Sequence, residues 1–182
     1  LMAWIELLKE KEGVDNVVHE MSKDVKRLET ITDRFSKIGS RAELINKDVV
    51  VLVTNAIDYL ESRIPVNSSF VTDFPNKSIV IPIIPTLFQW VIENLVKNAV
   101  DAIKGKGEIK VSISEDNTKV IISVIDNGSG IDKSLIKNIF KPGVTSKKRG
   151  WGLGLSLSKR IIEDYHKGNI FVMLSEKNAG TN

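Results

Sequence analysis

Cysteine is absent from this chain of 182 residues, and the chain contains no run of eighteen or more apolar residues. Without cysteine, neither a disulfide framework nor a thiolate metal site is available. Without a long apolar run, no segment is expected to span a membrane. The first residues, Leu1 to Trp4, lead into charged positions rather than into a signal-peptide core. These absences predict a cytoplasmic fragment without membrane contact, although its parent protein could be anchored in the inner membrane.

A strong excess of charge of one sign is also missing. The 26 lysines and arginines against 23 acidic residues give a net charge of +3, which is too small to indicate a polyanionic partner. The densest basic run, Lys147 to Arg149, has no interleaved aromatic residues, so we expect no nucleic-acid partner. The run is either a solvated charge patch or part of a lid that faces phosphate groups. The glycine-bearing segments on both sides of it favour the lid.

The N-terminal part of the chain carries a helical periodicity. Apolar residues recur at spacings of three and four between Val14 and Ile38, which predicts a long amphipathic helix. A shorter stripe occupies residues 1–11, and Gly13 provides a break between the two. The pattern predicts an antiparallel helical hairpin over residues 1–44. Because an isolated hairpin cannot cover both of its apolar faces, a second copy would complete a four-helix bundle in a homodimer. The alternative is that the stripe packs on the chain's own domain.

Another helix is predicted from a cap at Thr86 to about Lys104, after an extended stretch over residues 78–84. At 100° per residue one face carries Trp90, Asn94, Lys97, Asn98 and Asp101, and the opposite face carries the apolar residues Phe88, Ile92, Leu95, Val96, Ala99 and Ile103. The two asparagines lie one turn apart, so their amide oxygens could converge on a hydrated cation, and the lysine beside them could meet phosphate charge. The alternative is a solvent-facing polar stripe, in which glutamate and lysine would be more typical than asparagine.

The next two segments alternate in hydrophobicity. Residues 108–115 and 118–126 place apolar side chains at every second position, with Asp116-Asn117 between them, which predicts a β-hairpin. The second strand ends in Asp126-Asn127-Gly128-Ser129-Gly130. These glycines let the backbone approach a ligand closely, and a buried Asp126 carboxylate could accept a hydrogen bond from an adenine amino group. Taken alone, the segment could also be an ordinary Asp-Asn-Gly turn.

A further glycine-rich segment, Gly150-Trp151-Gly152-Leu153-Gly154-Leu155, precedes a helical pattern. Backbone N–H groups at a helix start favour anions. The segment is neither a Walker loop nor a dinucleotide-binding loop, because the required spacings are absent. Residues 141–149, which we term the lid, follow Phe140 and are suited to moving over phosphate groups. His166 is expected to end the helix before a strand over residues 169–174.

Four short polar or glycine-rich segments therefore follow one another along the chain: Glu93 to Ala99, Asp126 to Gly130, Phe140 to Pro142, and Gly150 to Leu155. In this order they resemble the N box, the first glycine box, the F box and the second glycine box of the ATP-binding domain of sensor histidine kinases. The resemblance implies an α+β fold, a two-layer α/β sandwich whose mixed sheet is covered by helices on one face, preceded by the helical hairpin. It also implies a dimerisation hairpin over residues 1–44 and an ATP-binding catalytic domain over residues 45–182.

The resemblance implies ATP and Mg²⁺ as cofactors. Asn98 resembles the magnesium ligand, with Asn94 as a second candidate ligand, and Asp126 resembles the adenine reader. The candidate catalytic residues are Glu93 and Asn98. The nucleotide contacts that the motifs imply are Asn94, Lys97, Asn98, Asp101, Asp126, Gly128, Gly130, Ile131, Phe140, Thr145, Ser146, Lys147, Gly150, Gly152, Leu153, Gly154, Leu155 and Thr181.

The implied reaction transfers the γ-phosphoryl group of ATP to a histidine, for relay to an aspartate of a response-regulator receiver domain. His19 lies on the second helix of the predicted hairpin and lacks the proline that follows the family's acceptor. Residues 1–8 are similar to the stretch after the acceptor, so we expect the acceptor upstream of Leu1. Two other functions stay open. One is ATP hydrolysis, in which Glu93 would activate water as in related ATPases, and the other is a dimerising module that only senses nucleotide.

Overall fold

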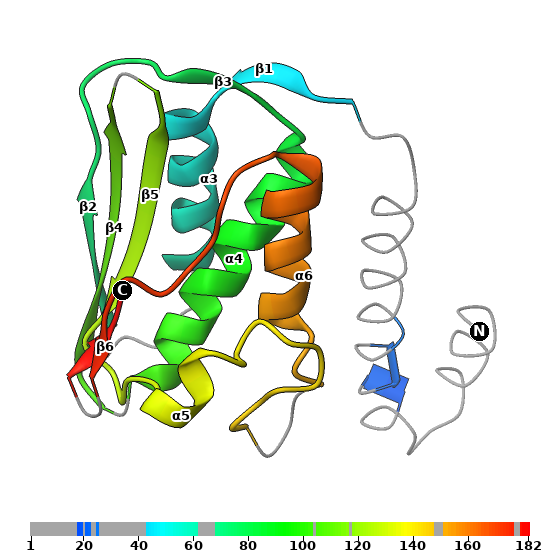
Figure 1. Ribbon diagram of the computed structural model, residues 1–182, viewed down its shortest axis with the longest axis vertical. Helices are drawn as coiled ribbons and strands as arrows, with labels where there is room; N and C mark the ends of the chain where they lie inside the picture. The colour runs from blue at the N-terminus through cyan, green and yellow to red at the C-terminus, as the bar shows by residue number, and fades with distance from the viewer. Residues whose placement is uncertain are drawn as a thin grey trace. The chain divides into compact units, whose positions relative to one another are not determined.

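A computed structural model (Figure 1) describes residues 18–19, 21–22, 25, 43–61, 68–103, 105–116, 118–147, 151–176 and 179–182. The chain divides into two compact units, residues 1–42 and residues 43–182. In the first unit all of the described residues are helical, namely Val18, His19, Met21, Ser22 and Val25. Residues 43 and 44, at the end of the predicted hairpin, are described and are not helical, and its other residues lie outside the described residues. The second unit contains every element discussed below.

A five-stranded mixed sheet forms one layer of the second unit. Its strand order is β2-β4-β5-β7-β6, with bounds of Ser68–Asp73, Gly107–Glu115, Val120–Asp126, Gly180–Thr181 and Ser175–Glu176. Strands β2 and β4 pair in parallel, and the other neighbours pair antiparallel. The predicted β-hairpin is confirmed as the pairing of β4 with β5. A separate antiparallel pair joins β1 to β3, with bounds of Ile45–Asp48 and Val80–Ile83.

Helices cover one face of this sheet, as Figure 1 shows for α3, α4 and α6. The helical bounds are α3 Val49–Glu61, α4 Pro85–Ala102, α5 Lys133–Ile136 and α6 Gly154–Arg160, and α6 continues into a π-helix, η1, at Ile161–Tyr165. The predicted α+β class with a mixed sheet is therefore confirmed. None of the helices in the described part of the chain is both long and apolar enough to cross a membrane.

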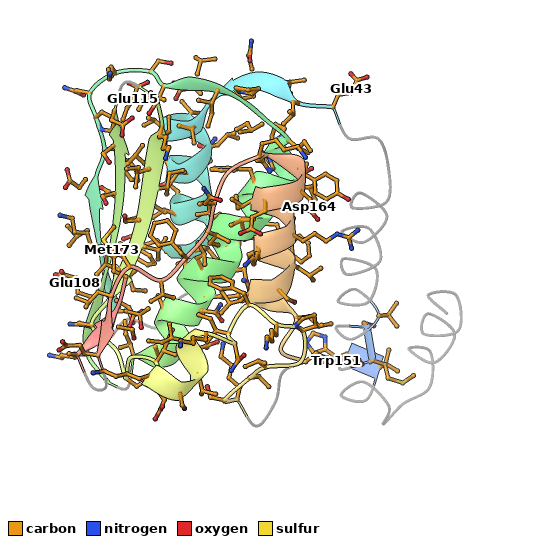
Figure 2. The ribbon with its side chains drawn as sticks, viewed as in Figure 1. Glu43, Glu108, Glu115, Trp151, Asp164 and Met173 are labelled. Carbon is orange, nitrogen blue, oxygen red and sulfur yellow. The ribbon has the colours of Figure 1, made fainter. Side chains whose placement is uncertain are left out.

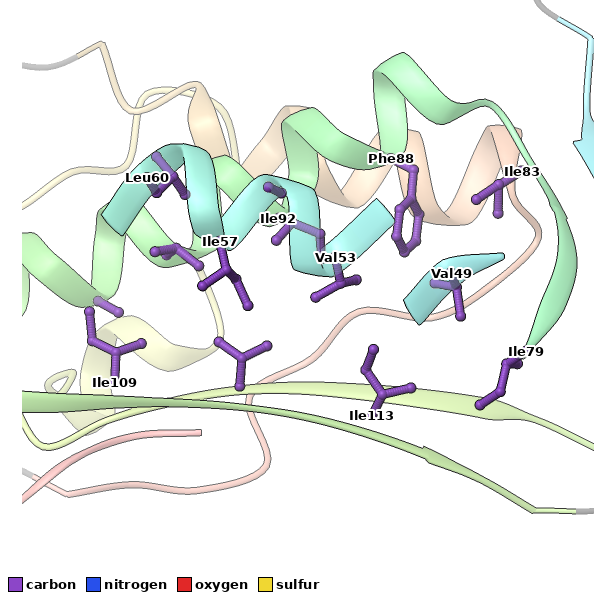
Figure 3. Close-up of a cluster of buried hydrophobic side chains, with 14 residues drawn as sticks. Val49, Val53, Ile57, Leu60, Ile79, Ile83, Phe88, Ile92, Ile109 and Ile113 are labelled. Carbon is purple, nitrogen blue, oxygen red and sulfur yellow. The ribbon is translucent and has the colours of Figure 1, made fainter. Parts of the chain in front are cut away.

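The core lies between the sheet and helices α3 and α4 (Figure 3). Alternate residues of β4 face the helices, because successive strand side chains point to opposite sides of a sheet. Ile109, Val111 and Ile113 are accordingly almost fully buried. Helix α3 contributes Val53 and Ile57 from its inner face. Each such side chain stabilises the fold by about 1.5–3 kcal/mol relative to an exposed position, and this layer holds α4 in place.

Two local predictions are wrong. Thr86 does not cap α4, because the helix begins one residue earlier at Pro85, and the cap position, Ile84, has no side-chain cap. Proline suits the first helical position, where its fixed backbone angle is preorganised and its missing N–H is not needed. The strand predicted over residues 169–174 is also not formed. Residues 170–174 form a continuous apolar run, but the backbone partner Asn182 reaches only Met173 and Leu174, and β6 begins after them.

Candidate functional site

The polar face of α4 is shorter than its sequence pattern predicts. Leu87 and Val91 lie on the same stripe as Asn94 and Asn98, one to three turns along the helix, yet both are almost fully buried. Helix α6 and η1 pack against α4 along its length (Figure 1). The two apolar residues on the polar stripe were the sequence signal for a second neighbour, but the pattern of α4 alone could not identify that neighbour as α6 and η1. The accessible polar face therefore begins at Asn94, near the start of α6.

Asn94 joins α4 to the start of α6. Its Nδ2 donates a hydrogen bond of 2.9 Å to Ser158 Oγ, and Ser158 is only 2% exposed. A Cβ atom at Gly154 would lie 3.2 Å from Asn94 Nδ2 and closer still to its Oδ1, so only glycine permits this approach. The prediction did not include Ser158. Its position four residues after Gly154, on the same side of a helix, was the signal that could have found it.

The lid crosses the polar face of α4 one turn further on. Lys147 Nζ donates to Asn98 Oδ1 at 2.9 Å and forms an ion pair with Asp101 Oδ2 at 2.6 Å. Thr145 stabilises the lid backbone by accepting from the Lys147 N–H through its hydroxyl. The side chains of Lys147 and Asp101 are 41% and 53% exposed. Surface pairs of this kind contribute little to stability, about 0–1 kcal/mol, so the contact can open at low cost.

Two further contacts tie the lid to the rest of the unit. The Gly143 N–H donates to the Gly152 carbonyl at 3.1 Å, and Gly152 has a φ of +64° with no room for a Cβ beside Gly143. Immediately before the lid, Lys159 Nζ lies 5.6 Å from the centre of the Phe140 ring. The side chain of Trp151 projects into solvent and is 83% exposed (Figure 2). These two contacts anchor the first part of the lid, and residues 148–150 lie outside the described residues.

Asp126 lies at the end of β5, where the sequence places it. It is 8% exposed, and its Oδ1 accepts a 2.9 Å hydrogen bond from the Gly128 N–H. Burial raises the pKa of this carboxyl group, and the Gly128 N–H partly offsets that rise. A Cβ at Gly128 would lie 2.6 Å from the Ala102 carbonyl carbon. Glycine therefore allows the loop after β5 to pack on the C-terminal end of α4, where the Ser129 N–H also donates to the Ala102 carbonyl.

A row of paired residues crosses the sheet at this point. Asp126 pairs with Ile109 on one side and with Thr181 on the other, and Thr181 pairs with Ser175. Directly opposite residues in antiparallel strands place their side chains on the same face. On the helix-covered face of the sheet, the apolar core at Ile109 is therefore followed by three polar side chains, those of Asp126, Thr181 and Ser175. Gly130, with a φ of +65°, passes against the Glu176 carbonyl beside this row.

The other predicted residues have less distinctive surroundings. Lys97 and Ser146 are exposed, while Glu93, Leu153 and Leu155 are half-buried. The described residues contain no group of three or more histidine, cysteine, aspartate or glutamate side chains that could hold a metal. A cavity of about 210 Å³ lies elsewhere, between α3 and β2, and its lining includes none of the predicted residues. The candidate site is therefore defined by the contacts among α4, the lid, α6 and the row that ends at Ser175.

Comparison with known proteins agrees with this arrangement. The family model for histidine kinase-, DNA gyrase B- and HSP90-like ATPases matches residues 84–182, which include α4, the lid, α6 and the polar row. The chain belongs to this ATPase family. Sporulation kinase E of Bacillus subtilis (strain 168) is 31% identical over 100% of this chain and 25% of its own length. Signal transduction histidine-protein kinase AtoS of Escherichia coli (strain K12) is 33% identical over 91% of this chain and 26% of its own length.

Solved structures show the same family. The nucleotide-free catalytic domain of histidine kinase ThkA matches with a TM-score of 0.69 and 32% identity, over 76% of this chain and 91% of that domain. ThkA in complex with the response regulator protein TrrA matches with a TM-score of 0.71 and 26% identity, over 98% of this chain and 53% of that chain. The chain is a catalytic, ATP-binding domain of the sensor histidine kinase type. It spans 25% to 37% of the length of the first curated relatives.

Proposed function

We propose that the chain binds Mg·ATP between α4, the lid and the polar row, and that it transfers the γ-phosphoryl group to a histidine outside residues 1–182. One observation carries the proposal. Lys147 of the lid lies on Asn98 and Asp101 of α4, while Asn94 of the same helix contacts α6. Three segments that are far apart in sequence thus meet where amide and ammonium groups could surround a polyphosphate.

Adenine would bind at the end of β5. The Asp126 carboxylate accepts from Gly128 through Oδ1, and its second oxygen would accept from the adenine amino group. Gly128 and Gly130 would form the floor of the base pocket because they allow close approach of the backbone. Ile131 and Thr181 would complete the pocket on the side of β7. A buried carboxylate that must stay ionised gives this end of the site its selectivity for a hydrogen-bond donor.

The phosphate groups would lie between the lid and the start of α6. Backbone N–H groups in the segment from Gly150 through Gly152 and Leu153 to Leu155 would face them, and Gly154 keeps this backbone close to Asn94. The ammonium groups of Lys97 and Lys147 and the hydroxyl groups of Thr145 and Ser146 would add charge and donors. Phe140 would anchor the first end of the lid through its contact with Lys159.

The donor set beside α4 fits Mg²⁺. Magnesium takes few protein ligands and completes its octahedral shell with water and phosphate oxygens. Asn98 Oδ1 offers a neutral oxygen that already accepts from a cationic group, Lys147 Nζ, and Asn98 is therefore the proposed ligand. Asn94 is the second candidate, although its amide also contacts Ser158 and Gly154. Bound Mg²⁺ would neutralise charge on the phosphate oxygens during transfer.

Phosphoryl transfer needs the nucleophile to be aligned with the γ-phosphate more than it needs covalent chemistry from the protein. Glu93, next to Asn94, is the candidate base, for an acceptor imidazole in phosphotransfer or for water in hydrolysis. We further propose that residues 1–44 form a dimerisation hairpin, separate from a catalytic domain over residues 45–182. The receiver domain of a response regulator is the proposed partner, because the related kinase ThkA has been crystallised with the response regulator TrrA.

Labelling with γ-labelled ATP tests this function. The chain is extended to include the histidine upstream of Leu1, and the label on the protein is tested for stability in base and lability in acid, the signature of phosphohistidine. We expect labelled protein for the extended chain and for its His19→Gln variant, and none for residues 1–182 alone. Release of inorganic phosphate without labelled protein would instead support hydrolysis. Loss of label in the His19→Gln variant would contradict the placement of the acceptor.

A further inference from the structure

Ser175 is a buried polar residue at the end of the polar row, and no contact with ATP is assigned to it above. It is 7% exposed and lies on the short strand β6. Its partner across the ladder is Thr181, whose other partner is Asp126. All three side chains therefore share one face of the sheet, and each is next to the following one. Ser175 is the last member, on the edge strand β6, of a polar row that begins at the proposed adenine reader.

One hydrogen bond of the Ser175 hydroxyl has a fixed direction, because its partner can only donate. The Ile131 N–H, which can only donate, donates to Ser175 Oγ at 2.8 Å. Ser175 then has one proton to donate. Two acceptors lie within reach, Thr181 Oγ1 at 3.0 Å and the Gly180 carbonyl at 3.2 Å. The choice between them decides whether Thr181 keeps its own proton free for a ligand or uses it on Ser175.

We propose that Ser175 is a positioning residue that makes Thr181 a hydrogen-bond donor to the adenine base. This inference rests on the proposed ATP site. When Ser175 donates to Thr181, the N–H of Ile131 and the two hydroxyl groups form a head-to-tail chain, and each bond polarises the next. The Thr181 proton is then directed to an acceptor. In adenine, the ring nitrogen N1 is the acceptor beside the amino group that Asp126 would bind.

Affinity measurements with two nucleotides test this role. Calorimetry compares the binding of Mg·ATP with that of Mg·1-deaza-ATP, in which a C–H group replaces N1. We expect Ser175→Ala to weaken binding of Mg·ATP by about fivefold, as for loss of one neutral hydrogen bond. The same variant should bind Mg·1-deaza-ATP as tightly as the unmodified chain does, because the missing acceptor already removes the interaction. A structural defect would weaken the binding of both nucleotides by the same factor.

Two further variants act as controls. Ser114→Ala removes an exposed hydroxyl group from β4, and it should change neither affinity. Thr181→Val removes the hydroxyl group but keeps the branched shape, and it should reproduce the loss of discrimination between the two nucleotides. Adding Ser175→Ala to Thr181→Val should then produce no further change in the ratio of the two affinities. If Ser175→Ala proves too unstable to purify, Ser175→Cys replaces it, because the thiol is of similar size and only a weak hydrogen-bond donor, and it should show the same loss of discrimination between the two nucleotides.

The outcomes separate this inference from the proposed function. If the unmodified chain binds no Mg·ATP, the ATP site itself is wrong. If it binds Mg·ATP but Ser175→Ala weakens ATP and 1-deaza-ATP by the same factor, then Ser175 is structural and the inference is overturned. Equal affinity of the unmodified chain for both nucleotides would also overturn it, because N1 would then accept no hydrogen bond from Thr181.

Discussion

The two ends of the candidate site are built differently. At the base end, Asp126 and Ser175 are buried, and backbone N–H groups hold both side chains at 2.8–2.9 Å. At the phosphate end, the Lys147 and Asp101 side chains form an ion pair with about half of each exposed. Buried, hydrogen-bonded groups are costly to rearrange, whereas an exposed ion pair opens easily. The comparison indicates that the base pocket exists before ATP binds, while ATP and Mg²⁺ complete the phosphate pocket.

The largest effect is expected at the phosphate end, where Asn98 accepts a hydrogen bond from Lys147. Asn98→Asp would place a carboxylate beside the phosphate groups, and like charges in a closed site cost several kcal/mol. The carboxylate would also bind Lys147 more strongly than the amide does. We expect affinity for Mg·ATP to fall by about a hundredfold or more. Calorimetry measures this loss, and Asn55→Asp on the exposed face of α3 serves as the matched control. Unchanged affinity in Asn98→Asp would remove α4 from the phosphate site.

The base end should respond strongly to Asp126→Asn. The Gly128 N–H fixes the amide oxygen of the variant, so its NH₂ group would face the adenine amino group. We expect affinity for ATP to fall by about thirtyfold, the value of a hydrogen bond to a charged acceptor. An affinity within threefold of the unmodified chain would show that Asp126 does not bind the base.

Asp126→Asn, which should weaken ATP binding, should increase the stability of the fold. Because burial raises the pKa of Asp126 in the folded chain, the ionised carboxylate destabilises the fold above that raised pKa. Below the ordinary value of 3.8, the group is neutral in both folded and unfolded states and the penalty disappears. Asp126→Asn should therefore raise the Tm by a few degrees at pH 7 and lose this advantage in acid. Thermal unfolding at several pH values measures it, and a Tm that falls at pH 7 would contradict the account.

The smallest effect is expected at the exposed lid. Lys147→Met removes the ion pair with Asp101 and a proposed phosphate contact, so ATP affinity should fall by about fivefold while the Tm stays nearly constant. The loss should shrink at high salt, where surface charges are screened. Lys77→Met is the matched control, since Lys77 forms an exposed ion pair with Glu115 away from the site. A large loss of stability in Lys147→Met would show that the lid is part of the fixed structure.

The sequence predicted the helices and strands at the two ends of the site better than it predicted the contacts between those elements. The alternation in residues 108–126 gave the hairpin and the position of Asp126, because strand period and turn residues are local properties. The burial of Leu87 and Val91 was missed although both are apolar residues on the polar stripe of α4. Their pattern could not identify the partner, because α6 and η1 come some sixty residues later. Residues 170–174 form an apolar run that is typical of a buried strand, but a strand also needs a partner along its whole length. Ser175 carries no local signal, since its role follows from pairing with Thr181.

Amide hydrogen exchange with and without Mg·ATP tests the difference between the two ends most directly. In the nucleotide-free chain, we expect slow exchange at the N–H groups of Gly128 and Ile131 and fast exchange over residues 141–147 of the lid. Mg·ATP should slow exchange strongly in the lid and change the base end little. Equal slowing at both ends would contradict a preformed base pocket, and no slowing at either end under saturating Mg·ATP would contradict the site itself.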